Sequence, residues 1–114
     1  MDKKLLLKAV EIYGSPIYLY DLEKIKSQLI KFNESFRSAG KIKVHYATKA
    51  LSNISILKFI MNLDCGLDAV SIQEIKLGLK AGFKPESILY TPNGVCIEEI
   101  NEAVKLGVKI NLDS

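Results

Sequence analysis

The sequence lacks tryptophan and contains a single histidine, His45, a single arginine, Arg37, and two cysteines, Cys65 and Cys96. Neither cysteine has the spacing of a metal ligand, and two cysteines alone make no disulfide framework. We therefore expect inert thiols in a reducing compartment. There is also no signal peptide and no apolar run long enough to cross a bilayer. These absences predict a cytoplasmic protein that does not enter a membrane.

Charge of one sign is not concentrated anywhere in the chain. The formal net charge is only +3, and the lysines are scattered rather than clustered. This pattern argues against a surface for nucleic acid or for a membrane. The 114 residues are 48% hydrophobic and 25% charged, which is typical of a globular protein with a modest core.

One unit, a strand followed by a helix, recurs along the chain. Apolar and polar residues alternate in the expected strands, and apolar residues recur at steps of three and four in the expected helices. The strands are predicted at 42–48, 67–70, 88–91 and 108–112, and the helices between them at 54–63, 72–81 and 97–106. Gly82 and Gly107 stand where helices commonly end. This alternation predicts an α/β fold with a parallel sheet, because each helix carries the chain between neighbouring parallel strands.

A different arrangement is expected before the first of these units. Residues 3–12 read as a helix, residues 17–20 as a short strand, and Asp21 as the N-cap of a helix that ends near Gly40. Four parallel strands are half of the eight in an α/β barrel, which takes about 250 residues. We therefore expect one partial barrel domain, with an N-terminal helix and strand in residues 1–20 and the first half of the barrel in residues 21–114. On this view the chain is the front part of a longer protein or one part of a split enzyme.

Lys49 is the most informative residue, because it closes the strand predicted at 42–48. Parallel α/β folds place their chemistry at this end of their strands. An amine there can form an imine with an aldehyde. The alternative is an ordinary solvated lysine at the end of a strand.

Three stretches, in order, resemble one enzyme family. They are the segment around Lys49, with the pattern Tyr-Ala-x-Lys-Ala-x-Ser-Asn from Tyr46 to Asn53, the segment 66–74 followed by 79–83, and the segment 90–95. Together they resemble the pyridoxal-phosphate decarboxylases built on an alanine-racemase-type barrel, the diaminopimelate decarboxylases in particular. The likeness runs from about Tyr13 to Ser114 and covers only the N-terminal part of a family member.

The resemblance implies pyridoxal 5'-phosphate as cofactor, bonded to Lys49, with Ala47 and Asp68 beside it. It implies decarboxylation of meso-diaminopimelate to L-lysine, a homodimer when the protein is complete, and a C-terminal β-domain that residues 17–20 would join. The missing C-terminal half would supply the glycine-rich phosphate loops and most of the substrate pocket. The alternatives are a polyamine-type decarboxylase, an alanine racemase, or a non-catalytic protein that carries the same cofactor. Leu51 departs from the family pattern, in which many relatives have asparagine.

Structural roles compete with functional ones at several polar residues. Ser71 and Glu74 have the spacing of a capping box, in which each side chain bonds the other residue's amide. Asp68 is either a residue beside the cofactor or a barrel-interior carboxylate paired with a lysine. His45 is expected to be packed in the barrel interior. Residues 91–94 read as a turn that rims the site.

Overall fold

The computed structural model describes residues 2–40 and 42–112, and in it four short strands form one parallel sheet in the order β1-β2-β3-β4. The strands are β1 (His45–Ala47), β2 (Gly66–Ala69), β3 (Ile88–Tyr90) and β4 (Lys109–Ile110). Ala47 pairs with Asp68, Asp68 with Leu89, and Leu89 with Lys109. The predicted α/β fold with four parallel strands is confirmed.

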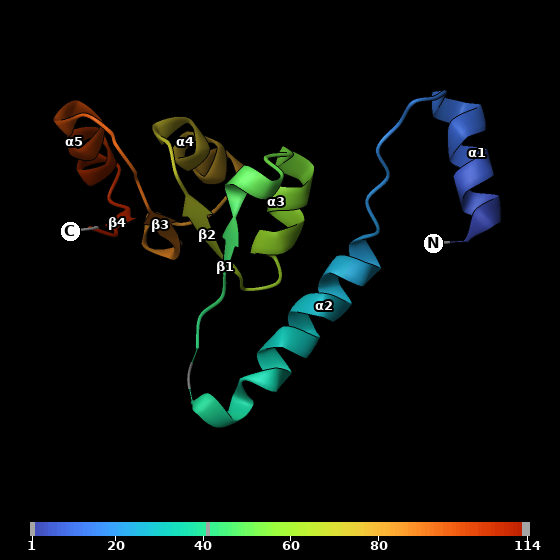
Figure 1. The fold of residues 1–114 in the computed structure, drawn as a ribbon, viewed down its shortest axis with the longest axis horizontal. Helices are drawn as coiled ribbons and strands as arrows, with labels where there is room; N and C mark the ends of the chain where they lie inside the picture. The colour runs from blue at the N-terminus through green and yellow to red at the C-terminus, as the bar shows by residue number, and fades with distance from the viewer. Residues whose placement is uncertain (1, 41, 113–114) are drawn as a thin grey trace.

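Three helices carry the chain between these strands and cover one face of the sheet (Figure 1). They are α3 (Ile54–Met61), α4 (Ile72–Ala81) and α5 (Ile97–Lys105). Because successive strand residues point to opposite faces, every second residue meets the helices. On the covered face, Leu67, Ala69, Ile88 and Tyr90 are completely buried. We call the other face, which carries Ala47, Asp68, Leu89 and Lys109, the open face.

Helix α4 shows how local sequence sets the ends of an element. The Ser71 hydroxyl accepts a hydrogen bond from the Glu74 amide, and the helix ends at Gly82, whose φ of 105° is left-handed. A residue with a Cβ disfavours that backbone conformation, so glycine suits the position. The helix accordingly begins and ends at the residues predicted from the sequence.

The N-terminal part is less closely integrated with the sheet. Helices α1 (Lys3–Tyr13) and α2 (Leu22–Ser35) begin at the caps Asp2 and Asp21, and neither contains a buried residue. In Figure 1, α1 stands apart from the sheet at the end of an extended connection. No helix in the described ranges has the length and apolar character needed to cross a membrane.

Residues 17–20 are extended without a paired strand among the described residues, so their predicted pairing with a C-terminal β-domain stays a prediction. One strand prediction needs correction, because the first barrel strand is shorter than predicted. It ends at Ala47, and Thr48–Ala50 form a 3₁₀ turn, η2, so Lys49 lies on a turn rather than on the strand.

The open sheet edges predict that the isolated 114-residue chain associates. Strands β1 and β4 each have a neighbour on one side only among the described residues, and Tyr18 is 90% exposed. Unpaired parallel strands offer free backbone donors and acceptors to another chain. We expect sedimentation to show oligomers whose size grows with concentration. A compact monomer over the whole concentration range would contradict this expectation.

Candidate functional site

Lys49 lies on turn η2, immediately beyond the carboxyl end of β1. Its side chain is exposed. The ion pair found within the described ranges joins Lys76 and Glu102, with 2.7 Å between Nζ and Oε1, and it does not involve Lys49. The Lys49 amine is therefore available for bonding to another molecule.

Hydrogen bonds on both sides hold the turn that carries Lys49. The completely buried Thr48 donates its hydroxyl to the backbone oxygen of Asp68, at 2.9 Å. The Leu51 amide donates to the Thr48 oxygen, at 3.1 Å, and the Tyr46 hydroxyl donates to the Leu51 oxygen, at 3.2 Å. Burial raises the pKa of Tyr46, with a smaller contribution from Tyr20, so the phenol keeps the proton that it donates. An exposed amine thus projects from a fixed backbone.

Asp68 lies on the open face opposite Ala47, next to the strand that leads to Lys49. Its carboxylate Oδ1 accepts a hydrogen bond from the Thr91 hydroxyl, at 2.7 Å. In the described part of the chain no lysine pairs with it, so the lysine partner considered from the sequence is replaced by a threonine. The structure brings Ala47, Asp68 and the Lys49 turn together. Their contact with a cofactor stays a prediction.

The capping box predicted at Ser71 and Glu74 is half correct. The Glu74 amide donates to the Ser71 hydroxyl oxygen, at 3.3 Å. The Glu74 carboxylate, however, accepts from the amide of Val70, at 2.7 Å, rather than from Ser71. Glu74 therefore ties its helix to the residue that directly follows β2, and it stiffens the loop at the edge that carries Lys49.

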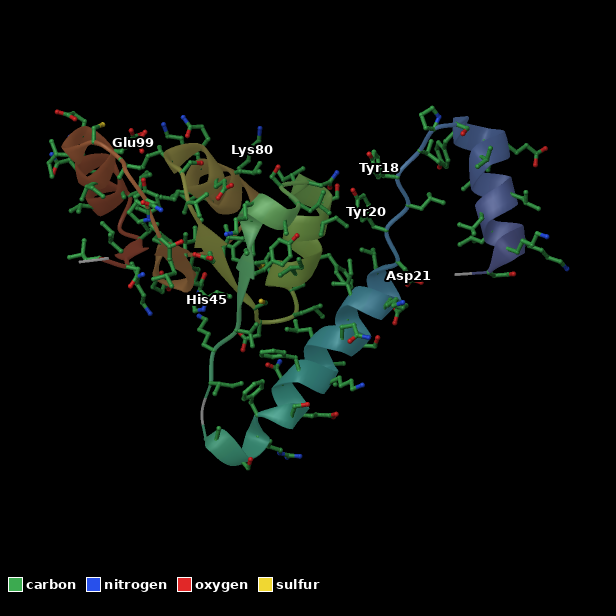
Figure 2. All side chains as sticks on the ribbon, viewed as in Figure 1. Tyr18, Tyr20, Asp21, His45, Lys80 and Glu99 are labelled. Carbon is green, nitrogen blue, oxygen red and sulfur yellow. The ribbon has the colours of Figure 1, made fainter. Side chains whose placement is uncertain are left out.

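His45 lies at the start of β1 and is partly buried (Figure 2). Its ring lies so close to Gly66 that a Cβ there would be 2.7 Å from Nε2, and it would also be 2.9 Å from the backbone oxygen of Ser87. Partial burial, and next the Lys43 charge, lower the pKa of His45 below its ordinary value. The ring is accordingly neutral near pH 7, and it serves as a packing group over Gly66.

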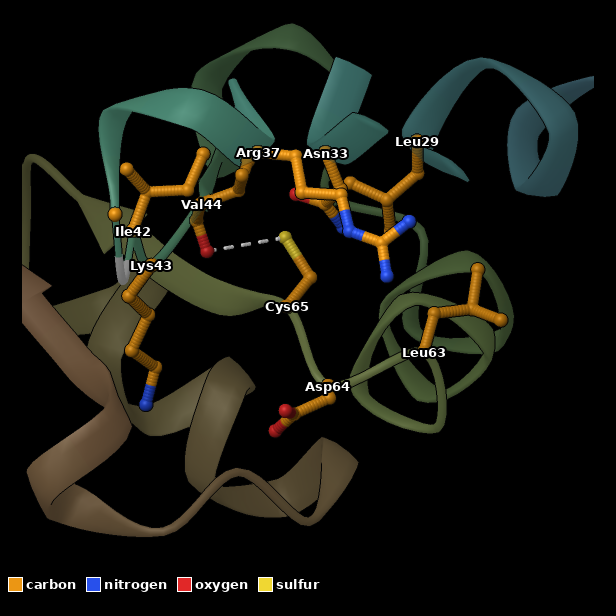
Figure 3. A pocket seen from close by; sticks show the side chains of 10 residues that line it. Leu29, Asn33, Arg37, Ile42, Lys43, Val44, Leu63, Asp64 and Cys65 are labelled. Atoms are coloured by element: carbon orange, nitrogen blue, oxygen red, sulfur yellow. Dashed lines mark hydrogen bonds between the residues drawn. The ribbon is translucent and has the colours of Figure 1, made fainter. Parts of the chain in front are cut away.

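A cavity of about 590 Å³ (Figure 3) is lined by Ile42, Lys43 and Val44, which precede β1, whereas Lys49 follows it. Its lining includes Arg37, Lys43 and Asp64, and the Cys65 thiol, which donates to the Val44 oxygen at 3.4 Å. Burial raises the pKa of Cys65, so this thiol is protonated and inert, as expected. Because parallel α/β folds place their chemistry at the carboxyl ends of strands, we assign the site to the Lys49 end.

The sequence did not indicate the roles of Thr48 and Thr91. Thr48 and Thr91 were each expected as the last residue of a strand, with Thr91 also opening a turn, yet both bond Asp68. Their partners are 20 and 23 residues away in the chain. No local pattern shows such bonds, and only the parallel register would have brought these residues together.

Comparisons with known proteins agree on one family. Residues 22–114 match the family model described as pyridoxal-dependent decarboxylase, pyridoxal binding domain. The chain is 43% identical to a diaminopimelate decarboxylase from Helicobacter pylori over 105 residues, 91% of this chain and 26% of that protein. It is 40% identical to the Campylobacter jejuni diaminopimelate decarboxylase over 103 residues, 90% of this chain and 25% of that protein.

Solved structures give the same result. The Helicobacter pylori diaminopimelate decarboxylase complexed with L-lysine superposes with a TM-score of 0.84 at 38% identity, covering 99% of this chain and 28% of that one. The M. jannaschii diaminopimelate decarboxylase in complex with L-lysine gives a TM-score of 0.88 at 27% identity, covering 96% of this chain and 26% of that one. The chain thus spans about a quarter of the length of these relatives.

The geometry at Ser71 yields a prediction about stability. Replacing Ser71 by alanine removes the acceptor for the Glu74 amide, and we expect a loss of about 1 kcal/mol in the free energy of unfolding. Denaturant titration measures it. Ser55→Ala is the control, because Ser55 is exposed on α3 and its hydroxyl has no hydrogen bond within the described ranges. Equal stabilities for the two variants would contradict the capping role.

Proposed function

Because this chain belongs to the pyridoxal-dependent decarboxylase family, we propose that it serves the decarboxylation of meso-diaminopimelate to L-lysine with pyridoxal 5'-phosphate. The observation that carries the proposal is Lys49, a free amine on a fixed turn at the carboxyl end of β1. The relatives named diaminopimelate decarboxylase support the substrate, as do the two solved relatives that hold L-lysine.

The described residues fit the aldehyde end of this cofactor. A primary amine is the group that bonds an aldehyde, and that of Lys49 has no carboxylate partner in the part of the chain that the structure describes. Ala47, whose side chain is a single methyl group, is the cross-strand partner of Asp68 on the open face. Asp68 adds a carboxylate to the same face. We therefore assign Lys49, Ala47 and Asp68 to the cofactor side of the site.

Lys49 and Asp68 have separate tasks in this proposal. When bound, pyridoxal phosphate supplies an electron sink for the bond to the departing carbon dioxide. The Lys49 Nζ would hold the cofactor through its aldehyde, and as a free amine it would hold or deliver a proton. The Asp68 carboxylate fixes negative charge on the open face, and Thr48 keeps Lys49 at the strand exit.

The wider assembly is part of the same proposal. The relatives are about four times longer than this chain, so we infer that sequence matching their remainder completes the barrel and supplies the phosphate site and the distal part of the substrate pocket. We further propose a homodimer that acts in the cytoplasm. Residues 1–20 would form the N-terminal extension of a partial barrel in residues 21–114.

Replacing Lys49 by arginine tests the assignment. The experiment uses the full-length protein, that is, this chain together with any further protein sequence encoded downstream in the same reading frame. Guanidinium stays protonated and cannot bond the aldehyde, so we expect turnover to fall by at least about a hundredfold. Borohydride fixes the cofactor to the lysine that carries it, and digestion should yield one labelled peptide that spans Lys49.

Lys43 and Lys58 are the matched controls, because both are exposed and neither lies on η2. Their replacement by arginine should leave turnover and labelling nearly unchanged. Cofactor found on either control lysine, or substantial decarboxylation by the Lys49→Arg protein, would overturn the assignment.

A further inference from the structure

Asp68 is held at two points by threonines from the strands on either side of it. The Thr48 hydroxyl donates to its backbone oxygen, at 2.9 Å, from the turn that follows β1. The Thr91 hydroxyl donates to its carboxylate Oδ1, at 2.7 Å, from the residue that follows β3. Asp68 is therefore fixed at its backbone on the side of Lys49, and at its carboxylate on the side away from Lys49.

The single hydroxyl proton of Thr91 has two acceptors within reach. Asp68 Oδ1 lies 2.7 Å from Thr91 Oγ1, whereas the backbone oxygen of Ala69 lies 3.5 Å away. The Ala69 oxygen already accepts from the Thr91 amide, at 2.8 Å. A short bond to a carboxylate is stronger than a long one to a neutral carbonyl, so the proton goes to Asp68.

The carboxylate has an alternative partner in Lys49. Asp68 is the cross-strand partner of Ala47, and parallel strands are roughly 4.8 Å apart. Lys49 follows Ala47 by two residues, and its flexible four-carbon stem reaches over such a separation. Yet Asp68 bonds Thr91, and within the described ranges Lys49 is in no ion pair.

We propose that Thr91 is a positioning residue that holds the Asp68 carboxylate toward β3 and thereby keeps the Lys49 amine free to take the cofactor. The inference rests on the proposed function, in which Lys49 carries pyridoxal phosphate. Without the Thr91 hydroxyl, the Asp68 carboxylate loses its bond toward β3 and becomes free to pair with the Lys49 ammonium. Such pairing keeps the amine protonated and therefore unreactive toward an aldehyde.

The test compares Thr91→Val with Thr91→Ser in the full-length protein freed of cofactor. Trinitrobenzenesulfonate reacts with neutral amines, and mass spectrometry of the digest gives the labelling rate of each lysine. We expect Thr91→Val to slow the labelling of Lys49 about two- to fivefold, the equivalent of one exposed ion pair. Thr91→Ser keeps the hydroxyl and should label at the wild-type rate. Lys58, on α3, is the internal control and should be unaffected in both variants.

A second substitution separates this effect from a loss of packing. In an Asp68→Asn background no carboxylate can pair with Lys49, so Thr91→Val should slow the labelling no further. A pyridoxal phosphate titration, followed by visible absorbance, should show weaker binding for Thr91→Val than for the wild type, and no further weakening when Thr91→Val is added to Asp68→Asn. If Thr91→Val does not fold, Thr91→Ala removes the same hydroxyl and takes its place.

Two results would overturn the inference. One is a folded Thr91→Val protein whose Lys49 labels at the wild-type rate, and the other is a slowing that persists in the Asp68→Asn background. Failure of the proposed function looks different, because borohydride would then fix the cofactor to a lysine other than Lys49. The labelling rates of the cofactor-free protein decide the role of Thr91 in either case.

Discussion

The parallel pairing of β1, β2 and β3 is the constraint on which the rest of the structure depends. Parallel neighbours cannot be joined by a tight turn, so each strand must be followed by a crossover, here a helix packed on one face of the sheet. Leu67, Ile88 and Tyr90 are completely buried beneath those helices. The same pairing brings every strand exit to one edge, and it thereby places Lys49, Asp68 and Thr91 within one region although the chain separates them by some twenty residues each.

The helices and the order of the strands could be predicted because their signals are local. Helix α4 has its cap, Ser71, and its terminating glycine, Gly82, adjacent to it in the sequence, so its limits were predicted to the residue. The end of β1 was not predicted, because the turn at Thr48 depends on a bond to Asp68, 20 residues away. Residues 17–20 have the composition of a strand, but composition alone does not provide a neighbouring strand.

The residues of the candidate site also fall into two groups, those indicated by local sequence and those that depend on partners far away in the chain. Lys49 was singled out by its position after an alternating segment, and Asp68 by the resemblance to the decarboxylase family, and the contact of either with a cofactor stays a prediction. The hydrogen-bond partners around the site could not be identified from the sequence. Thr91 replaced the lysine considered as the partner of Asp68, and Val70 replaced Ser71 as the donor to the Glu74 carboxylate. These bonds depend on side-chain reach across strands and loops, which a linear pattern does not contain.

The contact between His45 and Gly66 implies an order in which these two positions can change during evolution. A smaller residue in place of His45 would make no steric clash with Gly66. A side chain at position 66, in contrast, would meet the His45 ring and also the backbone oxygen of Ser87, which no substitution removes. Position 45 is therefore free to vary while position 66 is not, and among descendants of this chain the glycine should persist through lineages in which the histidine has been lost.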